Sequence, residues 1–292
     1  MSLRILPVRR TQFDDIVDFV TRLNAQAEHH IGFFGAREDD IRQTLAALDP
    51  PVHESFIVAE EDGIMVGLMG VEFDVEIGRA WLFGPLVDHP DWQTLADMLY
   101  AAVPPLLPEG IREHDIFCDV HNQNCRTFAT RHGFAMRSEA AILNLSRERF
   151  ALLPALAAEA YVEVYFEQLE ALHNLLFPGT YYTARQMVEK QDAETHLLVA
   201  TEYGQLQGYI FYKVEPEAAQ GYIGFIGVAE PYRNRGLGKR LMAAAVHVMA
   251  AAPEVQVVSL TTTASNAASM RLYASMGFAI ERTMAAFRKQ IG

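Results

Sequence analysis

The sequence of 292 residues contains only two cysteines and no apolar run of the roughly 18–20 residues that span a bilayer. Cys118 and Cys125 supply neither a disulfide framework nor a metal-binding pattern. Near the start, Arg4, Arg9 and Arg10 are not followed by the long apolar core of a secretory signal. We therefore expect a cytoplasmic protein that binds no metal and does not associate with a membrane.

Lysine is missing from residues 1–146, where 11 Arg stand against 23 Asp and Glu, a net charge of −12. Residues 147–292 carry 13 basic and 14 acidic side chains, a net charge of −1. The basic patch of a nucleic-acid-binding protein is absent, so we expect no nucleic-acid partner. The acidic first half favours solubility, and its field would also attract a cationic substrate.

Half of the residues are apolar and 21% are charged, which excludes wholesale disorder and allows a sizeable core. The length corresponds to two domains of about 150 residues each. Glycine- or serine-rich linkers and low-complexity tracts are missing, so we expect the two halves to pack together. The segment Leu152-Leu153-Pro154 interrupts the pattern and places the boundary between Ser146 and Ala158. The expected domains are residues 1–150 and 151–292.

A hairpin pattern occurs twice in the chain. Val58–Gly63 with Gly67 aligns with Val199–Gly204 with Gly208 at an offset of 141 residues. Each copy predicts two antiparallel strands joined by a tight glycine turn.

A second pattern repeats at nearly the same offset. Asn122 and Gly133-Phe134 align with Asn266 and Gly277-Phe278 at an offset of 144 residues. Two matches in the same order, with nearly equal offsets, indicate a duplicated domain of about 143 residues rather than a solenoid.

Both halves predict the same order of elements. A short strand leads into two helices, three strands follow, and then come a long helix, a strand, a short helix and a final pair of strands. Helices that alternate with strands in this way indicate a mixed α/β sheet. The expected ranges are helices 13–26 and 39–47 and strands 55–60, 64–75 and 80–87 in the first half, then helices 157–176, 184–190 and 239–251 and strands 196–201, 206–214, 221–228 and 255–260 in the second.

The strongest chemical pattern is Arg233-x-x-Gly236-x-Gly238, between a strand-like run at 222–228 and an alanine-rich helix at 239–251. A glycine turn at a helix start presents free N–H groups and the positive end of the helix dipole to an anion. Arg233, Arg235 and Lys239 add positive charge. The segment predicts a cradle for a diphosphate, although the two common nucleotide motifs, G-x-x-x-x-G-K-[ST] and G-x-G-x-x-G, are absent.

This pattern resembles the coenzyme loop of the GNAT superfamily of acetyl-CoA-dependent N-acetyltransferases, in which R/Q-x-x-G-x-G/A holds the coenzyme A pyrophosphate. The resemblance implies an α/β fold of two tandem domains, each with a central, mostly antiparallel mixed sheet flanked by helices. It implies that the second half binds acetyl-CoA as the acyl-donor cosubstrate. The residues that it assigns to this site are Ile226, Gly227, Val228, Arg233, Asn234, Arg235, Gly236, Leu237, Gly238, Lys239 and Asn266.

A second family element lies about 30 residues later, within Thr261–Phe278. By position, Asn266 and Tyr273 match the Asn and Tyr of the family's Asn…Tyr…Gly-Phe pattern. The resemblance implies that Asn266 hydrogen-bonds the pantetheine arm and that Tyr273 is the catalytic acid for the leaving thiolate. A helix cap or turn for Asn266, and core packing for Tyr273, are the alternatives.

The first half resembles the family only in its fold. Where the coenzyme loop should lie, residues 87–95 lack the glycines and basic side chains, and Asp88 and Asp91 would repel a diphosphate. Ala129 stands at the position equivalent to Tyr273. We therefore expect a degenerate first domain without a coenzyme loop, and an acetyltransferase domain in the second half.

The base that deprotonates the acceptor amine is unassigned. Many family members carry a carboxylate on the strand before the coenzyme loop, but residues 223–228 hold no acidic residue. Glu159, Glu163 and Glu167 recur every four residues, which predicts one face of a helix and is typical of a solvated face. A chain of waters, or an amine that arrives neutral, is an alternative. The candidate side chains are Glu163, Glu167, His173 and Glu215, with packing or capping at the end of a helix as the alternative for His173.

The acceptor pocket in the family is built by the loop between the first two helices, here residues 173–182. Its side chains are aromatic and polar, and they could enclose a small amine or stack on a cation. Core packing of at least two of them is an equal alternative. The predicted substrate-binding residues are His173, Phe177, Tyr181 and Tyr182. The counterpart at 29–35 contains His29-His30, without a convergent set of metal ligands.

The sequence thus predicts an N-acetyltransferase that transfers acetyl to a primary amine by direct attack in a ternary complex. The alternatives are a non-catalytic acyl-CoA sensor and a transferase with another acyl-CoA donor. The acceptor, a small molecule or a peptide amine, is not identified, and the protein is expected to be a monomer or a homodimer.

Overall fold

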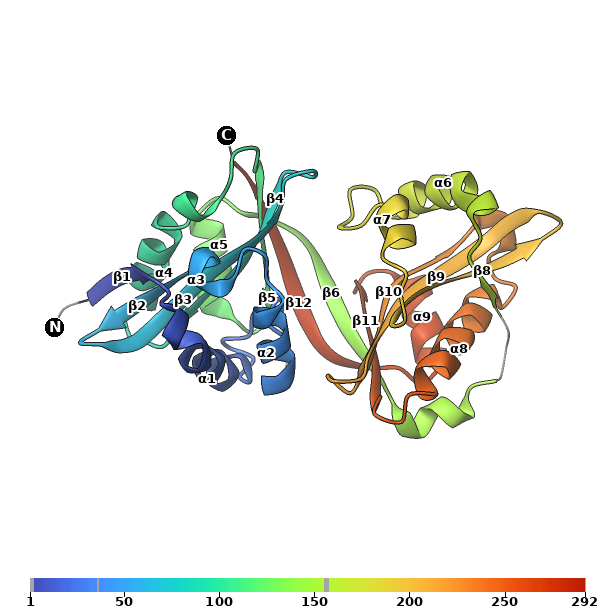
Figure 1. Ribbon diagram of the computed structural model, residues 1–292, viewed down its shortest axis with the longest axis horizontal. Helices are drawn as coiled ribbons and strands as arrows, with labels where there is room; N and C mark the ends of the chain where they lie inside the picture. The colour runs from blue at the N-terminus through green and yellow to red at the C-terminus, as the bar shows by residue number, and fades with distance from the viewer. Residues whose placement is uncertain (1–2, 36, 155–157, 292) are drawn as a thin grey trace. The chain divides into compact units, whose positions relative to one another are not determined.

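The computed structural model describes residues 3–35, 37–154 and 158–291 (Figure 1). Their contacts divide the chain into two units. The first unit comprises residues 1–140 and 282–292, and the second comprises residues 141–281. The division therefore falls before the expected position 150, and residues 282–292, which we expected in the second domain, belong to the first unit.

The first unit is built on a sheet with the strand order β1-β2-β3-β4-β5-β12. Its neighbouring strands are antiparallel, except that β4 and β5 are parallel. The strands are β1 (Leu3–Pro7), β2 (Phe56–Glu61), β3 (Ile64–Asp74), β4 (Arg79–Val87), β5 (Glu113–Asp119) and β12 (Ala279–Gln290). The helices are α1 (Phe13–Asn24), α2 (Glu38–Ala46), α3 (Val52–Ser55), α4 (Trp92–Ala101) and α5 (Gln123–Arg131).

The second unit has the corresponding sheet, in the order β7-β8-β9-β10-β11-β6, with β10 and β11 parallel. The strands are β7 (Glu159–Ala160), β8 (Thr195–Glu202), β9 (Gln205–Glu215), β10 (Gln220–Val228), β11 (Val257–Thr263) and β6 (Ala135–Ser146). The helices are α6 (Phe166–Leu176), α7 (Ala184–Glu189), α8 (Leu237–Ala250) and α9 (Ala267–Ser275). The expected α/β fold, with a mostly antiparallel mixed sheet flanked by helices in each unit, is confirmed.

The duplication is visible in the backbone of the two hairpins. The turn Asp62-Gly63 has φ angles of 49° and 84°, and the turn Tyr203-Gly204 has φ angles of 50° and 75°. Two successive positive φ values fit the right-handed twist of the strands that such a turn joins. A β-bulge follows Ala59 in the first hairpin and Ala200 in the second, again at an offset of 141.

Each unit receives its last strand from the other copy of the repeat. β12 ends the second repeat, but it pairs with β5 of the first unit from Met284–Asp119 to Gln290–Glu113 (Figure 1). It also contributes Phe287 to the core of the first unit. Leu143 and Leu145 of β6 lie in the core of the second unit. The expected final pair of strands is wrong, because each repeat ends in one long strand without a turn residue in its middle.

The expected helix 157–176 is too long, and residue 157 lies outside the described residues. Glu159 lies in β7, Glu163 begins a 3₁₀ helix at Glu163–Tyr165, and α6 begins at Phe166. The β-branched and aromatic residues of this segment favour an extended backbone, and Val162 adopts one with φ −131° and ψ 145°. The three glutamates therefore do not share a helix face.

The other expected helices and strands are confirmed to within a few residues. Among the described residues, no helix is long and apolar enough to cross a membrane.

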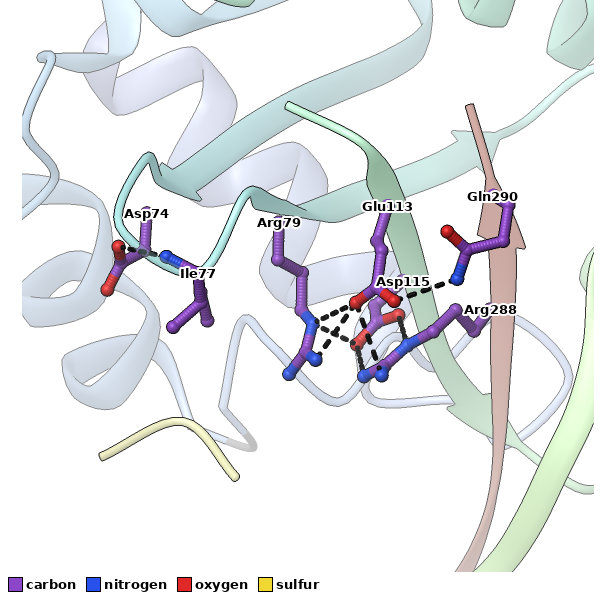
Figure 2. A network of polar contacts seen from close by, with 7 residues as sticks. All are labelled: Asp74, Ile77, Arg79, Glu113, Asp115, Arg288 and Gln290. Carbon is purple, nitrogen blue, oxygen red and sulfur yellow. Dashed lines mark hydrogen bonds and ion pairs between the residues drawn. The ribbon is translucent and has the colours of Figure 1, made fainter. Parts of the chain in front are cut away.

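An ion-pair network fixes β12 to the first unit (Figure 2). Arg288 donates from Nε and Nη2 to the two oxygens of Asp115, at 2.7 Å each. Arg79 of β4 donates from Nε to Oε2 of Glu113 at 2.9 Å, and Gln290 donates to Oε1 of the same carboxylate at 2.8 Å. The four charged side chains are only 9–23% exposed, so each buried charge depends on its partner.

Glu113 makes this network sensitive to acid. Burial alone would raise its pKa, but the hydrogen bonds from Gln290 and Arg79 and the charges of Arg288 and Arg79 outweigh burial and lower the pKa below its ordinary value of 4.5. A carboxylate with a lowered pKa stabilises the folded state above its unfolded pKa, and this contribution is lost as the pH falls through the folded value.

We predict that Asp115→Asn lowers the free energy of unfolding by about 2–3 kcal/mol, because Arg288 loses a bidentate partner in a partly buried site. The stability of the wild type should also decline as the pH falls below about 4.5. Urea denaturation at several pH values measures both effects. The control is Asp88→Asn, which breaks an exposed pair with Arg22 and should cost no more than about 1 kcal/mol. Equal losses in the two variants would contradict the role of the network.

Candidate active site

In the second unit, the parallel strands β10 and β11 are paired over only the first part of β10. Their pairing runs from Gln220–Val257 to Ile223–Leu260 and ends there, while β10 continues its pairing with β9 to Val228. From residue 224 onward, the edge of β10 that faced β11 is therefore released. Backbone N–H and C=O groups on such an edge need a partner, which a ligand can supply.

A β-bulge at Gly224 separates the two parts of β10. The register of β10 against β9 shifts between Ile223 and Phe225. Residues two apart on a regular strand share a face, but Ile223 lies in the core beneath α8 and Phe225 in the core beneath α6. The bulge therefore turns Phe225 toward the loop between α6 and α7, at the point where β10 leaves β11.

The glycine loop follows β10 directly and begins α8. Asn234 and Gly236 have φ angles of 61° and 81°, and Gly236 is the residue that caps α8. A Cβ at Gly236 would meet no atom within 4 Å, so its backbone angle rather than space calls for glycine. A Cβ at Gly238 would lie 3.2 Å from Leu272, so this glycine allows α8 to approach α9.

The loop presents positive charge and free donors. Arg233, Arg235 and Lys239 are exposed, and Arg233 donates from Nε to the carbonyl oxygen of Val228 at 3.0 Å. The N–H groups of the first turn of α8 have no acceptor within the helix. This arrangement can receive an anionic group of the diphosphate type. A hollow of about 340 Å³ next to it is lined by Glu202, Gln207, Tyr232, Arg235, Gly236, Leu237 and Arg240.

Asn266 and Tyr273 lie at α9, the helix that follows β11. Oδ1 of Asn266 accepts from the backbone N–H of Ser269 at 3.1 Å, which makes Asn266 the N-cap of the helix. Tyr273 is only 5% exposed and packs in the core. Burial raises its pKa, against hydrogen bonds with Ser269 and Thr262 that lower it, so the hydroxyl is protonated at neutral pH.

The aromatic residues of the α6–α7 loop gather around Phe225. The ring of Tyr181 lies 4.9 Å from that of Phe225, and Phe177 lies 5.1 Å from it. The hydroxyl of Tyr181 is 3.3 Å from where a Cβ of Gly224 would be. Tyr182 stacks edge-on against Tyr181 at 4.8 Å. Three of the predicted substrate-binding residues are thus brought together over the bulge.

His173, the fourth, lies beneath this loop and is 1% exposed. Its Nε2 is 2.8 Å from the carbonyl oxygen of Tyr182, and its Nδ1 is 2.6 Å from the hydroxyl of Tyr209. A carbonyl can only accept, so Nε2 carries the proton and Tyr209 donates to Nδ1. Burial lowers the pKa of His173, which keeps the ring neutral.

The other candidate bases lie in different places. Glu163 is exposed and pairs with Arg185 at 3.1 Å. Glu215 pairs with Lys213 at 3.1 Å. Glu167 is exposed in the first turn of α6. The structure does not gather these carboxylates at the opening between β10 and β11. Among the described residues, no group of three or more His, Cys, Asp or Glu side chains is arranged to hold a metal.

The first unit has the same divergence of strands, but its own chain fills the gap. The parallel pairing of β4 and β5 ends at Trp81–Asp115. Beyond it, Ile31 forms a bridge to Cys118, and the N–H of Gly32 donates to the carbonyl of Phe117 at 2.8 Å. Because β12 occupies the opposite edge of β5 along its whole length, this loop takes the edge that β4 has left. Among the described residues, the bridge has no counterpart in the second unit.

Aromatic packing closes the gap in the first unit. Phe33 lies between Phe83 of β4, at 5.7 Å, and Phe117 of β5, at 5.9 Å. Ile31 and Phe34 are fully buried. The helix that corresponds to α8 is α4, and Asp88 pairs with Arg22 in the turn before it.

Tyr209 and Phe225 did not figure among the residues predicted from the sequence. Both lie in apolar strands and look like core residues. One signal for Tyr209 was available, because a tyrosine hydroxyl in an otherwise apolar strand needs a buried hydrogen-bond partner. No sequence pattern identified His173 as that partner.

Two matched asparagines test the helix caps of the site. Asn122 accepts from the N–H of Cys125 at 3.0 Å, as Asn266 does from Ser269. We predict that Asn266→Ala and Asn122→Ala each lower the free energy of unfolding by about 1 kcal/mol through the lost cap, measured by urea denaturation. Only Asn266→Ala should also weaken acetyl-CoA binding in calorimetry. If both variants bind the coenzyme equally well, Asn266 only caps the helix and does not contact the coenzyme.

Residues 162–278 match the model of the acetyltransferase (GNAT) family. A search of the curated proteins finds no match to the sequence. A GCN5-related N-acetyltransferase from Sphaerobacter thermophilus is 17% identical, with a TM-score of 0.71 over 99% of this chain and 95% of that one.

A tandem GNAT protein from the clavulanic acid biosynthesis pathway is 18% identical, with a TM-score of 0.67 over 100% of this chain and 99% of that one. A fungal GCN5-related glucosamine N-acetyltransferase region is 15% identical, with a TM-score of 0.69 over 99% of this chain and 38% of the longer fungal chain. At these identities the likeness concerns the fold. Residues 162–278 thus match a GNAT acetyltransferase domain, and the whole chain shares the two-domain fold of a tandem GNAT protein.

Proposed function

We propose that the protein is an acetyl-CoA-dependent N-acetyltransferase whose active site lies in the second unit. The observation that carries this proposal is the opening between β10 and β11, which ends directly at the glycine loop of α8. One anion-binding loop and one released strand edge suit a donor with a diphosphate at one end and an extended amide-bearing arm at the other.

The residues around the opening suit the donor's parts. The first-turn N–H groups of α8, with Arg233, Arg235 and Lys239, would hold the diphosphate. The released edge at Ile226–Val228 would pair with the amide groups of the arm. Because Oδ1 of Asn266 is engaged in the helix cap, its amide NH₂ group is the donor left for that arm.

The reaction needs a neutral amine, a stabilised carbonyl oxygen and a protonated leaving group. The amine nitrogen attacks the thioester carbonyl, the new C–N bond forms, and the C–S bond breaks. A backbone N–H of Ile226–Val228 would donate to the developing oxyanion. Tyr273 would give its proton to the thiolate, and its raised pKa keeps that proton available at neutral pH. The nitrogen releases its excess proton to water or to a nearby carboxylate, and water returns a proton to Tyr273, so that the proton balance closes.

The first unit would then act as a scaffold without coenzyme. Ile31 and Phe33 occupy the place between β4 and β5 that the donor would need. The turn before α4 carries Asp88 and Asp91 in place of basic residues, which disfavours a diphosphate. Its acidic surface would raise the local concentration of cationic amines.

A sensor that binds acyl-CoA without turnover is the second candidate. It is favoured by the absence of a carboxylate on β10 and by the pairing of Glu163 and Glu215 with basic side chains. Thiol release on mixing acetyl-CoA with amines separates the two functions. Competition between acetyl-CoA and longer acyl-CoA donors tests whether the enzyme uses a donor other than acetyl-CoA.

We predict one acetyl-CoA site per chain, lost in the double variant Arg233→Ala/Gly236→Asp. These changes remove a positive charge and place a carboxylate at the start of α8. Isothermal titration calorimetry measures the number of sites and the affinity. The matched control is Arg137→Ala/Gly133→Asp, because Gly133 is also left-handed, with φ 77° and no atom within 4 Å of its Cβ position.

Three outcomes decide this proposal. Binding that survives in the control and disappears in the double variant supports a coenzyme site at α8. An absence of binding to the wild type contradicts an acetyl-CoA-dependent enzyme. Two sites per chain would contradict the scaffold role of the first unit.

We also predict that Tyr273→Phe lowers kcat about 10²-fold or more while the acetyl-CoA affinity changes little. Phenylalanine keeps the packing of the ring and removes the hydroxyl, with its acidic proton and its hydrogen bonds to Ser269 and Thr262. The assay follows thiol release from acetyl-CoA with spermidine, an aminoglycoside, free amino acids and a short peptide as acceptors. An unchanged kcat with an accepted amine would reduce Tyr273 to a core residue.

A further inference from the structure

His173 joins three parts of the second unit through two hydrogen bonds. It lies near the end of α6, accepts at Nδ1 from Tyr209 of β9, and donates from Nε2 to the carbonyl of Tyr182 in the α6–α7 loop. Both ring nitrogens are occupied and the ring is 1% exposed, so the side chain is not free to touch a substrate or to collect a proton.

Tyr209 ties this pair of bonds to the released part of β10. In the sheet, Tyr209 stands opposite Gly227. A Cβ at Gly227 would lie 2.7 Å from the Tyr209 ring, so the ring covers the backbone of β10 there. His173 also lies edge-on to Phe225 at 5.0 Å. The imidazole therefore sits between the loop and the stretch of β10 that would face the donor.

The far end of the same loop is fixed separately. Thr183 caps α7 by accepting from the N–H of Gln186 at 3.2 Å, and the Gln186 side chain accepts from the N–H of Thr183 at 2.8 Å. Tyr182, whose carbonyl accepts from His173, is the residue just before this capping box. Residues 177–182 are thus clamped at His173 and Thr183, with Tyr181 held over Gly224.

The first unit shows what a different anchor does to the equivalent loop. Asn24, the last residue of α1, donates to the carbonyl of Gly35 at 2.7 Å and accepts from the N–H of Ile31 at 2.6 Å. These bonds seat Ile31 on the edge of β5, where it fills the gap between the strands. In the second unit, the anchoring residue is His173, and it binds the loop at the carbonyl of Tyr182 instead.

We infer that His173 is a positioning residue that holds the α6–α7 loop as the wall of the acceptor site and keeps it out of the gap between β10 and β11. This inference rests on the proposed acetyltransferase function for its kinetic consequence, but its structural part does not. It reassigns His173 from substrate contact or base to anchor, with Tyr209 as its partner.

The test compares His173→Leu with His173→Gln. Leucine fills the space without hydrogen bonds, whereas the amide NH₂ of glutamine can still donate to the carbonyl of Tyr182. The matched control is His30→Gln in the first unit, because His30 is also buried and bonds through Nδ1 to a backbone carbonyl, that of Asn24 at 2.7 Å.

The first readout needs no substrate. Hydrogen exchange followed by mass spectrometry should show at least about tenfold faster exchange in residues 177–183 of His173→Leu, near wild-type exchange in His173→Gln, and no change there in His30→Gln. The ¹⁵N spectrum of His173 in the wild type should show the neutral ring with its proton on Nε2. Unchanged exchange in His173→Leu, or a proton on Nδ1, would overturn the anchor.

The second readout separates positioning from catalysis. With an amine accepted in the assay above, His173→Leu should raise KM for the amine at least about tenfold and leave the acetyl-CoA affinity within about threefold. His173→Gln should restore most of KM. A loss of kcat in both variants, with loss of one limb of the pH profile, would make His173 the base. If no amine is acetylated, the proposed function fails, and the exchange result still decides the anchor.

Discussion

The second unit is organised by the divergence of β10 and β11, two parallel strands that share hydrogen bonds only as far as Ile223. Backbone groups released in the middle of a sheet cannot stay buried without partners. The bulge at Gly224 both ends the pairing and turns Phe225 to the α6 face. Phe177 and Tyr181 of the α6–α7 loop pack against Phe225, and the glycine loop follows directly after the released stretch of β10.

The same split in the first unit has a different outcome, because the chain itself fills the gap there. There the edge of β5 is completed by Ile31 and Gly32, and Phe33 packs between the two strands. A loop that satisfies the strand edge from within the chain leaves no backbone donors for a ligand. The filled gap, together with Asp88 and Asp91 before α4, is the physical basis of our proposal that the coenzyme binds in the second unit.

The two copies are also joined by exchange of their last strands. Phe287 of β12 lies in the core of the first unit, and Arg288 is bound to Asp115 in a site that is mostly closed to water. The first unit thus depends on residues that the chain supplies last. A linear division at residue 150 assigns β12 to the wrong unit. The composition of β6 and β12 does not indicate which of the two sheets each strand joins.

The sequence by itself determined the elements whose conformation is local. The turns at Asp62-Gly63 and Tyr203-Gly204, the glycine start of α8 and the cap at Asn266 follow from left-handed φ values and side-chain capping, which neighbouring residues dictate. Only the tertiary structure decided the exchange of β6 and β12, the pairing of Glu159 with Val199 of β8 and the hydrogen bonds of His173 with Tyr209 and Tyr182. Those depend on partners far along the chain, and no residue pattern within one segment specifies them.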